Sequence, residues 1–460
     1  MLKKLIEKYL NGNNKIIFTD KDSSYKRLEL RERVNSYKNI IKKKKIQNRH
    51  LRGFAIYLDR DIDYFALILA CWLSNIFYLP FSKNINKRDL NYQLKASGVN
   101  YFVFKKNNNI HFKKLNPNKI VKRNLSYLIF TSGSTGEKKG VKITVENFTS
   151  YIKSLKRQFN SNFKARSILI NGEISFDIVN ADIAFALLYD CEICITEDSK
   201  NLLSFFEILE NRKAESIYAV PSMWENICFF TATQGKKYNF IKQINSGGEI
   251  FTYQLYKKIK QIAPKAKIFN FYGPTEFTIN STCCELIVKK SYKNKLLDES
   301  LNFTIGKPLP GVKIKILENG ELLLSGKQHM QGYINSKYNC NYINGRKYYP
   351  TGDIVRQDKN KNIFFLGRLK DYIKHKGYRL NLQNISNTIS NETSSTVIVK
   401  IINNSLIAFI KKRKKKLILE QIKKKLAKKL DFNELPTNYV FLNEFPKLTN
   451  GKIDINNLKI

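Results

Sequence analysis

Residues 127–141 read Tyr-Leu-Ile-Phe-Thr-Ser-Gly-Ser-Thr-Gly-Glu-Lys-Lys-Gly-Val, an apolar strand-like run that leads into a loop of hydroxyl groups and glycines. Glycine lets the backbone approach a ligand closely, and bare N–H groups beside hydroxyls form a concave anion site. Lys139 adds a point charge. The loop lacks the Gly-Lys-Ser/Thr ending of a Walker loop and the Gly-x-Gly-x-x-Gly dinucleotide pattern. We therefore interpret it as a phosphate-binding loop of another kind, with a plain linker as the alternative.

The pattern around this loop predicts an α/β fold. After the loop, apolar residues from Val145 to Phe159 recur at helical spacing, so a strand–loop–helix unit is expected. Elsewhere, helical patterns alternate with strand-like runs, which include residues 101–104, 127–130, 167–170 and 267–271.

The C-terminal third has a different texture, which predicts a second domain. Short strands and turns begin near residue 318, with Asn319-Gly320 as a hairpin signal. A boundary is predicted near Gly367–Lys370. We expect a large N-terminal domain of layered β-sheets and helices, residues 1–368, and a small mobile α+β domain, residues 369–460.

The composition favours a folded chain with anionic partners. The chain has 460 residues, too many for one ordinary core, and 43% of them are hydrophobic, which argues against disorder. Lys and Arg number 81 against 38 Asp and Glu, a formal net charge of +43. This balance favours nucleic acid, an acidic protein or phosphate ligands. The alternative is the coding bias of an A- and T-rich genome, in which case the basic run 411–416 is a solvated turn.

The cysteines and apolar segments predict a cytoplasmic protein without a membrane span. Seven cysteines are scattered, and Cys191 and Cys194 form a single Cys-x-x-Cys with no second pair at zinc-finger spacing. Free thiols in a reducing cytosol are therefore expected. The N-terminus lacks the cleavage site of a secretory signal. The uncharged stretch Tyr64–Phe81 approaches span length, but Pro80 and polar residues interrupt it, so we predict a buried helix followed by a strand.

Two segments fit a nucleotide site together with the loop. Asn270-Phe-Tyr-Gly-Pro-Thr-Glu276 places Tyr272 and Glu276 on either side of a tight turn, where an aromatic face suits a purine and a carboxylate suits Mg²⁺ beside phosphates. In Tyr349-Pro-Thr-Gly-Asp353, an aspartate after a glycine turn suits two ribose hydroxyls. Each segment alone is also compatible with an ordinary surface turn.

Two later segments complete the set. Phe365-Leu-Gly-Arg-Leu-Lys-Asp-Tyr-Ile-Lys-His-Lys-Gly-Tyr-Arg379 places Arg368 near the same ribose and glycines at the domain junction. Asn450-Gly-Lys-Ile-Asp454 carries Lys452 on a turn, from which it could neutralise charge on a reacting phosphate. A solvated turn is again the alternative for each segment alone.

Together these five segments resemble the motifs of the adenylate-forming superfamily, which includes acyl-CoA synthetases, luciferases and the amino-acid-activating domains of nonribosomal peptide synthesis. They occur in the family's order and at about its spacing, over nearly the whole chain. The resemblance implies ATP and Mg²⁺ as cofactors. It places the ATP phosphates at Thr131, Ser132, Gly133, Ser134, Thr135, Gly136 and Lys139, adenine at Gly248, Glu249 and Tyr272, the rest of the nucleotide at Asn270, Gly273 and Thr275, Mg²⁺ at Glu276, the ribose at Asp353 and Arg368, catalysis at Lys452, Glu276 and Thr135, and the hinge at Lys370.

The substrate class is indicated by Ser175-Phe-Asp177. This segment resembles the Phe-Asp segment of amino-acid-activating members, whose aspartate binds the α-amino group. A buried carboxylate is costly without a cation, so it selects for amines. Fatty-acyl members lack this aspartate and usually carry a His-containing segment, and none of the four histidines here has that context. A surface aspartate is the alternative.

The implied specificity pocket consists of Asp177, Ile178, Ala181, Tyr218, Ile244, Ser246, Phe271, Ile279 and Asn280. Tyr218 and Phe271 would take up space, which indicates a modest substrate side chain. Three departures from the family pattern concern Lys138 in place of a usual proline, Asn381 in place of a common glutamate, and a shortened segment at Leu435-Pro-Thr-Asn-Tyr-Val.

The expected reaction is the ATP-dependent activation of an amino acid, followed by transfer to the phosphopantetheinyl thiol of a carrier protein, as in freestanding D-alanine–carrier-protein ligases. Because the chain ends eight residues after Lys452, an acidic carrier acting in trans is expected. No nucleic-acid partner is expected. The alternatives are an acyl-CoA or acyl-carrier-protein synthetase that acts on a non-amino carboxylic acid, and a nucleic-acid-binding protein with a degenerate enzyme fold.

Overall fold

The computed structural model describes residues 1–117, 124–132, 138–288, 296–298, 301–369, 372–375, 378–403, 405–412, 419–427, 429–430, 432–446, 453–454 and 457–459. Contacts divide the chain into two compact units. The large unit comprises Met1–Lys315, Leu323–Pro350 and Asp358–Ile363, and the small unit comprises Ile316–Leu322, Thr351–Gln357 and Phe364–Ile460. The domain boundary between residues 368 and 369 stays a prediction.

The large unit contains a nine-stranded sheet whose central strands are parallel. Along the sheet, the strands are β15 (Lys307–Pro308), β14 (Thr282–Glu285), β13 (Lys267–Tyr272), β12 (Gln243–Gly247), β11 (Ser216–Tyr218), β9 (Ser167–Ile170), β10 (Glu192–Ile195), β1 (Ile16–Thr19) and β2 (Ser24–Lys26). Strands β9 and β11 are wholly buried, as expected of parallel strands that are covered on both faces.

A second sheet of the large unit has seven strands, of which β7, β4, β3 and β5 run parallel. In order along the sheet they are β18 (Gly332–Tyr333), β8 (Lys138–Thr144), β7 (Leu125–Ser132), β4 (Phe77–Pro80), β3 (Gly53–Tyr57), β5 (Tyr101–Lys106) and β6 (Asn109–Lys114).

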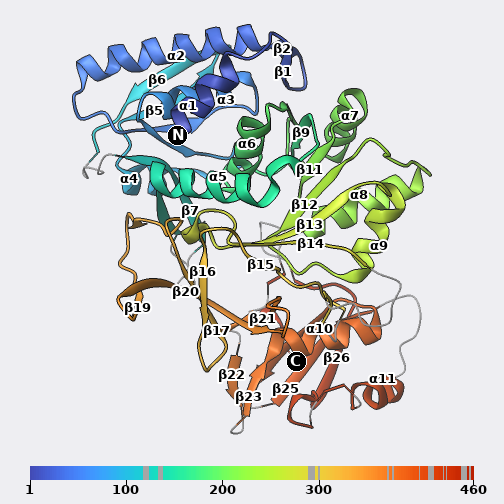
Figure 1. Ribbon diagram of the computed structural model, residues 1–460. Helices are drawn as coiled ribbons and strands as arrows, with labels where there is room; N and C mark the ends of the chain where they lie inside the picture. The colour runs from blue at the N-terminus through green and yellow to red at the C-terminus, as the bar shows by residue number, and fades with distance from the viewer. Residues whose placement is uncertain are drawn as a thin grey trace. The chain divides into compact units, whose positions relative to one another are not determined.

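Helices of the large unit cover these sheets (Figure 1). They are α1 (Leu2–Leu10), α2 (Arg27–Gln47), α3 (Ile62–Leu73), α4 (Lys87–Ser97), α5 (Val145–Phe159), α6 (Ile178–Tyr189), α7 (Leu202–Arg212), α8 (Pro221–Thr233) and α9 (Tyr253–Ile262). Buried residues of α7, α8 and α9 form one hydrophobic cluster with β11, β12 and β13. Helix α5 contacts β7 and β8 of one sheet and also α6, which lies on β9 and β10 of the other.

A third sheet has the order β16-β17-β20-β19, with β21 beside β20, and its strands supply residues to both units. They are β16 (Lys313–Ile316), β17 (Glu321–Ser325), β20 (Arg346–Gln357), β19 (Asn341–Ile343) and β21 (Ile363–Arg368).

In the part of the small unit that the structure describes, the remaining residues form two short sheets and the α-helices α10 (Leu382–Thr393) and α11 (Leu419–Leu426). Strands β22 (Tyr372–His375) and β23 (Tyr378–Asn381) form one sheet, and β24 (Val397–Ile402), β25 (Ser405–Lys411) and β26 (Asn438–Leu442) form the other. Its own hydrophobic core joins both helices to β24 and β25. The prediction of an α/β fold of layered sheets and helices with a small C-terminal part is confirmed.

Local signals explain several of these elements. Helix α3 begins at the Asp61 cap, whose carboxylate accepts a hydrogen bond from the Tyr64 backbone at 3.0 Å. Its residues are apolar on nearly every face, which suits a buried helix. The stretch 64–81 is therefore a buried helix followed by strand β4, as predicted. No helix within the described ranges is both long and apolar enough to cross a membrane.

The predicted helix from Val145 to Phe159 is confirmed as α5, but the prediction that it follows the loop directly is wrong. The described chain resumes at Lys138 with strand β8, which pairs antiparallel with β7 before α5 begins at Val145. Val141 and Ile143 alternate with polar residues and are buried, so these β-branched residues pack as a strand. The glycine-rich loop thus lies between two antiparallel strands and is not followed directly by a helix.

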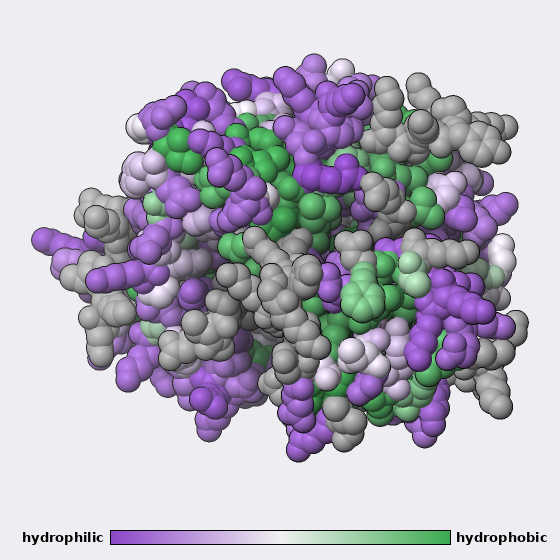
Figure 2. Space-filling model, turned by 90° about the horizontal axis from the view of Figure 1, so that it is seen from below, coloured by the Kyte–Doolittle hydropathy of each residue, from purple (hydrophilic) through white to green (hydrophobic). Residues whose placement is uncertain are grey.

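The cysteines are free thiols, as predicted. All seven lie within the described chain and none forms a disulfide. Cys191 and Cys194 are both buried, so their Cys-x-x-Cys spacing has a packing role. In the space-filling view, hydrophilic side chains dominate the face that is shown, with hydrophobic ones in patches between them (Figure 2). This agrees with the excess of lysine in the composition.

Candidate functional site

The predicted substrate pocket gathers at the carboxyl ends of adjacent parallel strands of the nine-stranded sheet. Tyr218 is the last residue of β11, and Ser246 and Phe271 are the next-to-last residues of β12 and β13. Asp177 lies in the connection from β9 to α6. This edge of a parallel sheet is where α/β proteins bind ligands. Of the predicted pocket residues, Asp177 and Ile178 are half-buried, whereas Ala181, Tyr218, Ile244, Ser246, Phe271, Ile279 and Asn280 are buried.

One oxygen of the Asp177 carboxylate is buried and lacks a hydrogen-bond partner, so a cationic group could bind it. Asp177 immediately precedes α6 but makes no capping hydrogen bond through its side chain. Its Oδ2 atom is buried and has no hydrogen-bond partner. Burial raises the pKa of the Asp177 carboxyl to about 6, and the charge of Glu276 acts in the same direction, against hydrogen bonds from the Thr275 side chain and the Ile279 backbone. A cationic ligand group would satisfy the orphaned oxygen.

Four buried tyrosines lie close enough to this carboxylate to be affected by its charge. Burial raises the pKa values of Tyr78, Tyr127, Tyr151 and Tyr218, and the charge of Asp177 contributes to each rise. The four rings come from β4, β7, α5 and β11, so both sheets of the large unit contribute to the surroundings of Asp177. Aromatic faces in a dry environment also favour a bound ammonium group.

The turn after β13 is strained and firmly anchored. Thr278 and Ile279 adopt φ values of 57° and 71°, which β-branched residues rarely do. Gln328 holds them in place through two hydrogen bonds. Its side-chain amide donates to the backbone carbonyl of Asn280 at 2.8 Å, and its backbone carbonyl accepts from the Thr278 hydroxyl. A Cβ atom at Gly273 would lie 2.5 Å from the Ile279 carbonyl, so this turn requires glycine there.

A hydrogen-bonded chain crosses the pocket residues. The Tyr218 hydroxyl donates to Asn280 Oδ1 at 3.1 Å, and Asn280 Nδ2 donates to the Tyr151 hydroxyl at 3.0 Å. The Tyr218 ring also stacks on Phe271, with a centroid distance of 5.6 Å. The Ser246 hydroxyl donates to the Ala219 carbonyl at 2.9 Å. Asn280 thus links Tyr218 to Tyr151, whereas the buried Tyr127 hydroxyl and Asp177 Oδ2 have no hydrogen-bond partner.

The predicted nucleotide residues lie nearby on the same sheet edge. Gly248 and Glu249 are exposed, and Tyr272, Gly273 and Thr275 are half-buried. Both oxygens of Glu249 accept hydrogen bonds from Ser222, at 2.8 Å from its backbone and 2.9 Å from its hydroxyl, so Glu249 fixes the first turn of α8. Asn270 donates to the Thr304 carbonyl at 2.9 Å, while its buried Oδ1 has no partner. Adenine contacts by these residues stay a prediction.

Tyr333 joins two residues that were predicted for phosphate and metal binding. Its hydroxyl donates to Glu276 Oε1 at 2.8 Å, and Lys139 Nζ lies 5.4 Å from the centre of its ring. Strand β18, which carries Tyr333, pairs with β8, which carries Lys139. Of the predicted phosphate loop, Thr131 lies on β7 opposite Lys139, and Ser132 ends that strand. Gly133, Ser134, Thr135 and Gly136 lie outside the described residues.

The described residues fit a magnesium site in which the protein supplies one carboxylate and the substrate phosphates and water supply the other ligands. In the described ranges, no group of three or more His, Cys, Asp or Glu side chains could hold a metal ion alone. Mg²⁺ is usually held by one or two carboxylates together with substrate phosphates and water. Glu276, beside Lys139, offers one such carboxylate.

The predicted ribose residues contact each other in the small unit. Arg368 Nε lies 2.8 Å from Asp353 Oδ1, and the Asp353 side chain is only 2% exposed. The backbone N–H of Asp353 donates to the Thr351 hydroxyl at 3.0 Å. Ribose binding stays a prediction. The predicted hinge residue Lys370 and catalytic residue Lys452 lie outside the described residues.

Two departures from the family pattern have structural partners. Lys138 Nζ forms an ion pair with Asp89 at 2.8 Å. Asn381 donates to the Leu366 carbonyl at 3.1 Å, and a Cβ atom at Gly367 would lie 2.2 Å from the Asn381 amide nitrogen. Both substitutions therefore form specific local contacts.

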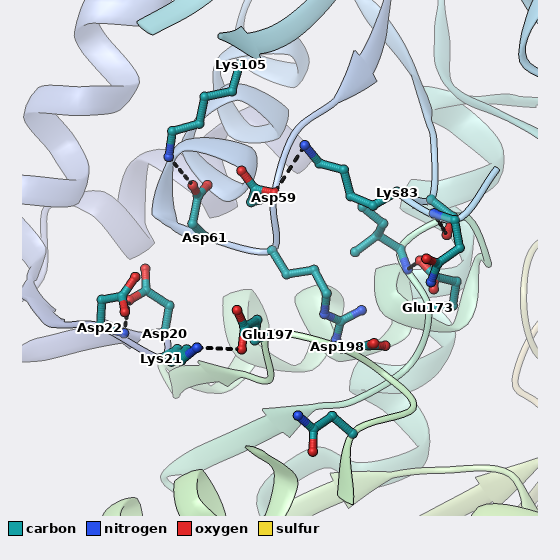
Figure 3. Close-up of a pocket in the computed structure, with 15 residues that line it drawn as sticks. Asp20, Lys21, Asp22, Asp59, Asp61, Lys83, Lys105, Glu173, Glu197 and Asp198 are labelled. Atoms are coloured by element: carbon teal, nitrogen blue, oxygen red, sulfur yellow. Dashed lines mark hydrogen bonds and ion pairs between the residues drawn. The ribbon is translucent and has the colours of Figure 1, made fainter. Parts of the chain in front are cut away.

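A charged pocket of about 430 Å³ lies apart from all the predicted residues. Figure 3 shows its lining, with ion pairs that include Lys21–Glu197 at 2.8 Å. Arg60, on the loop before α3, is one of the lining residues. Arg60 donates to the carbonyls of Thr196 and Gly172, each at 2.6 Å. These contacts tie loops of the two sheets together, which gives Arg60 a structural role.

Several residues of the site have no signal in the sequence. Tyr151, Gln328 and Tyr333 belong to no motif, and their partners are 129, 48 and 57 residues away in the chain. Only contacts across the fold identify them.

The sequence of the chain is similar to those of several known proteins. The chain is 28% identical over 365 residues to a D-alanine–D-alanyl carrier protein ligase of Bacillus licheniformis, covering 72% of this chain and 70% of the relative. It is 25% identical over 480 residues to bacitracin synthase 2 of the same species, covering 96% of this chain. The chain spans only 18% of the length of that synthase.

The fold matches that of o-succinylbenzoate CoA synthetase from Bacillus subtilis in complex with its acyl-adenylate intermediate. The TM-score is 0.78 at 16% identity, and the match covers 99% of this chain and 97% of the other. A family description, "AMP-binding enzyme", matches residues 105–334, which is half of the chain. The chain therefore belongs to the AMP-binding enzyme family, the adenylate-forming enzymes that its motifs resemble.

Proposed function

We propose that the protein activates an amino acid as its adenylate and transfers the aminoacyl group to the phosphopantetheinyl thiol of a carrier protein. Family membership supports the first half-reaction. The likeness to a D-alanine–D-alanyl carrier protein ligase supports an amino acid as the substrate and a carrier protein as the acceptor.

The observation that carries the proposal is the orphaned Oδ2 oxygen of the Asp177 carboxylate. This oxygen is buried without a partner, and burial raises the pKa of the carboxyl to about 6. Such a group is costly to the fold unless a cation pairs with it. The ammonium group of an amino acid supplies that cation, whereas a fatty or aryl acid leaves the carboxylate unpaired. Asp177 therefore selects substrates that carry an amine.

In the first half-reaction, the substrate carboxylate attacks the α-phosphate of ATP. A bond forms between the carboxylate oxygen and the α-phosphorus, and pyrophosphate leaves with the electron pair of the broken P–O bond. Lys139, placed by β8 beside Tyr333, and Lys452 neutralise phosphate charge, and Asp353 with Arg368 holds the ribose. Bound Mg²⁺ would screen the phosphates and be held by Glu276. Catalysis then rests on positioning and charge stabilisation, with no covalent enzyme intermediate.

The test is ATP–pyrophosphate exchange with the full chain, over the common amino acids and their counterparts that lack the amine. Exchange that depends on an amino acid, and fails with the corresponding 2-hydroxy or unsubstituted acid, supports the proposal. Exchange with carboxylic acids that lack an amine, in preference to amino acids, would show that the protein is an acyl-CoA or acyl-carrier-protein synthetase instead.

The acceptor is tested by loading of a purified carrier protein, measured by intact mass. Carrier proteins are typically acidic, and α11 presents the exposed side chains of Lys423, Lys424 and Lys425. These charges would steer an acidic carrier, so transfer should slow as salt is raised, because exposed charges are screened beyond about 10 Å at 0.1 M. Transfer to free coenzyme A with no carrier loading at any salt concentration would refute this part of the proposal.

A further inference from the structure

The side-chain end of the proposed amino-acid site is enclosed by paired polar groups. Asn280 follows Ile279, whose backbone N–H is a hydrogen-bonding neighbour of the Asp177 carboxylate. Tyr151 and Tyr218 are close enough to Asp177 to feel its charge. Any amino acid whose ammonium pairs with Asp177 therefore lies beside the Tyr218–Asn280–Tyr151 chain.

Each end of the Asn280 side-chain amide has a partner within the protein. Its amide pairs with Tyr218 at 3.1 Å on one side and with Tyr151 at 3.0 Å on the other. Either orientation of the amide leaves both ends facing a hydroxyl, which is able to donate or accept. The backbone carbonyl of Asn280 accepts from Gln328 at 2.8 Å, so the residue is fixed from three directions.

The same residues leave little room for a large substrate side chain. Tyr151 is 0% exposed, Tyr218 1% and Asn280 4%. The Tyr218 ring stacks on Phe271, and Tyr151 lies at a centroid distance of 6.5 Å from Phe148. A bulky side chain would have to displace rings that are fully packed, which is costly in a dense interior.

Given the proposed function, on which this rests, we infer that the substrate is an amino acid with a small, uncharged aliphatic side chain, and that Tyr151 is a positioning residue that sets this preference. A polar side chain that reached Asn280 would meet an amide that already has a partner at each end, and it would lose its own hydration. Tyr151 acts through Asn280 and needs no contact with the reacting atoms.

Exchange by the wild-type protein tests the inference first. We expect kcat/KM for glycine or alanine to exceed that for leucine, phenylalanine, aspartate and lysine by more than about 100-fold. Preference for a large or charged side chain would overturn this inference while leaving the proposed function intact. Exchange with non-amino acids only would overturn both.

The variant Tyr151→Phe tests the positioning role. It keeps the ring but removes the partner of Asn280 Nδ2, so a buried donor becomes available to a substrate hydroxyl. The ratio of kcat/KM for serine over alanine should rise about tenfold, mainly through KM for serine. The control is Tyr189→Phe, which removes a buried hydroxyl that has no partner, near the far end of α6. An unchanged serine-to-alanine ratio in Tyr151→Phe, or an equal rise in the control, would overturn the assignment.

Discussion

Replacing Asp177 by asparagine should stabilise the fold while it removes amino-acid activation. A carboxyl whose pKa is held near 6, against an ordinary value of 3.8, costs about 3 kcal/mol when it is ionised in the folded state. Asparagine has almost the same size and no charge. Its amide would leave a donor or acceptor unpaired in place of Oδ2, at about 1–2 kcal/mol. We therefore expect Asp177→Asn to raise the free energy of unfolding at neutral pH by about 1–2 kcal/mol.

The pH dependence separates this cause from simple packing. Between pH 3.8 and about 6, the folded state holds more protons on Asp177 than the unfolded state does. The stability of the wild type thus falls as pH rises through this window, and the full penalty is present above it. The advantage of Asp177→Asn should be complete near pH 7.5 and lost near pH 4, because the folded carboxyl is then protonated and only a small part of the ionisation penalty remains.

Urea unfolding at several pH values, followed by circular dichroism, measures this effect. The matched control is Asp22→Asn, because Asp22 is an exposed aspartate and its loss should change stability by less than about 0.5 kcal/mol. In parallel, ATP–pyrophosphate exchange with amino acids should fall by at least about 100-fold in Asp177→Asn, from the loss of the ammonium partner. An equal gain in stability at both pH values, a loss of stability at neutral pH, or intact exchange would refute the reasoning.

Three further changes test the supports of the site. Tyr333→Phe removes a hydrogen bond to the Glu276 carboxylate and should raise the Mg²⁺ concentration for half-maximal exchange about tenfold, whereas an unchanged magnesium titration would contradict this role. Gln328→Leu removes the side-chain anchor of the strained turn after β13 and should lower the free energy of unfolding, measured in urea, by about 1–3 kcal/mol. Unchanged stability would contradict this anchoring role. Arg368→Ala leaves the buried carboxylate of Asp353 without its 2.8 Å partner and should raise KM for ATP more than KM for the amino acid, which kinetics with each substrate varied in turn will show.

The sequence predicted those elements whose signal is local. The strands at 101–104, 127–130, 167–170 and 267–271 lie within β5, β7, β9 and β13. Apolar composition was enough to find them, because buried parallel strands read as continuous apolar runs. Strand β8 was not predicted because it begins with two lysines and Gly140, which continue the polar character of the loop, and only Val141 and Ile143 alternate as in a strand.

The candidate site likewise contains residues that have a signal in the local sequence and residues that have none. Gly273 and Glu276 were predicted from a turn that requires particular residue types, and Asp177 was predicted from the resemblance of its segment to a family motif. Tyr151, by contrast, is one apolar-face residue of an amphipathic helix, and nothing nearby in the sequence sets it apart. Its role depends on a contact with a residue 129 positions away.

Substrate specificity can therefore depend on residues that belong to no motif. The charged residues at turns can define the reaction class, because they must meet ATP and the α-amino group at fixed places. The size and polarity of the side chain that fits depend instead on ordinary core residues such as Tyr218 and Tyr151, which are buried and packed on their neighbours. A change there alters the shape of the pocket without touching a motif, and its effect spreads through the packed interior. Two chains with identical motifs can thus activate different amino acids, and we infer that the hydrogen bonds that hold Asn280 help to set the substrate of this one.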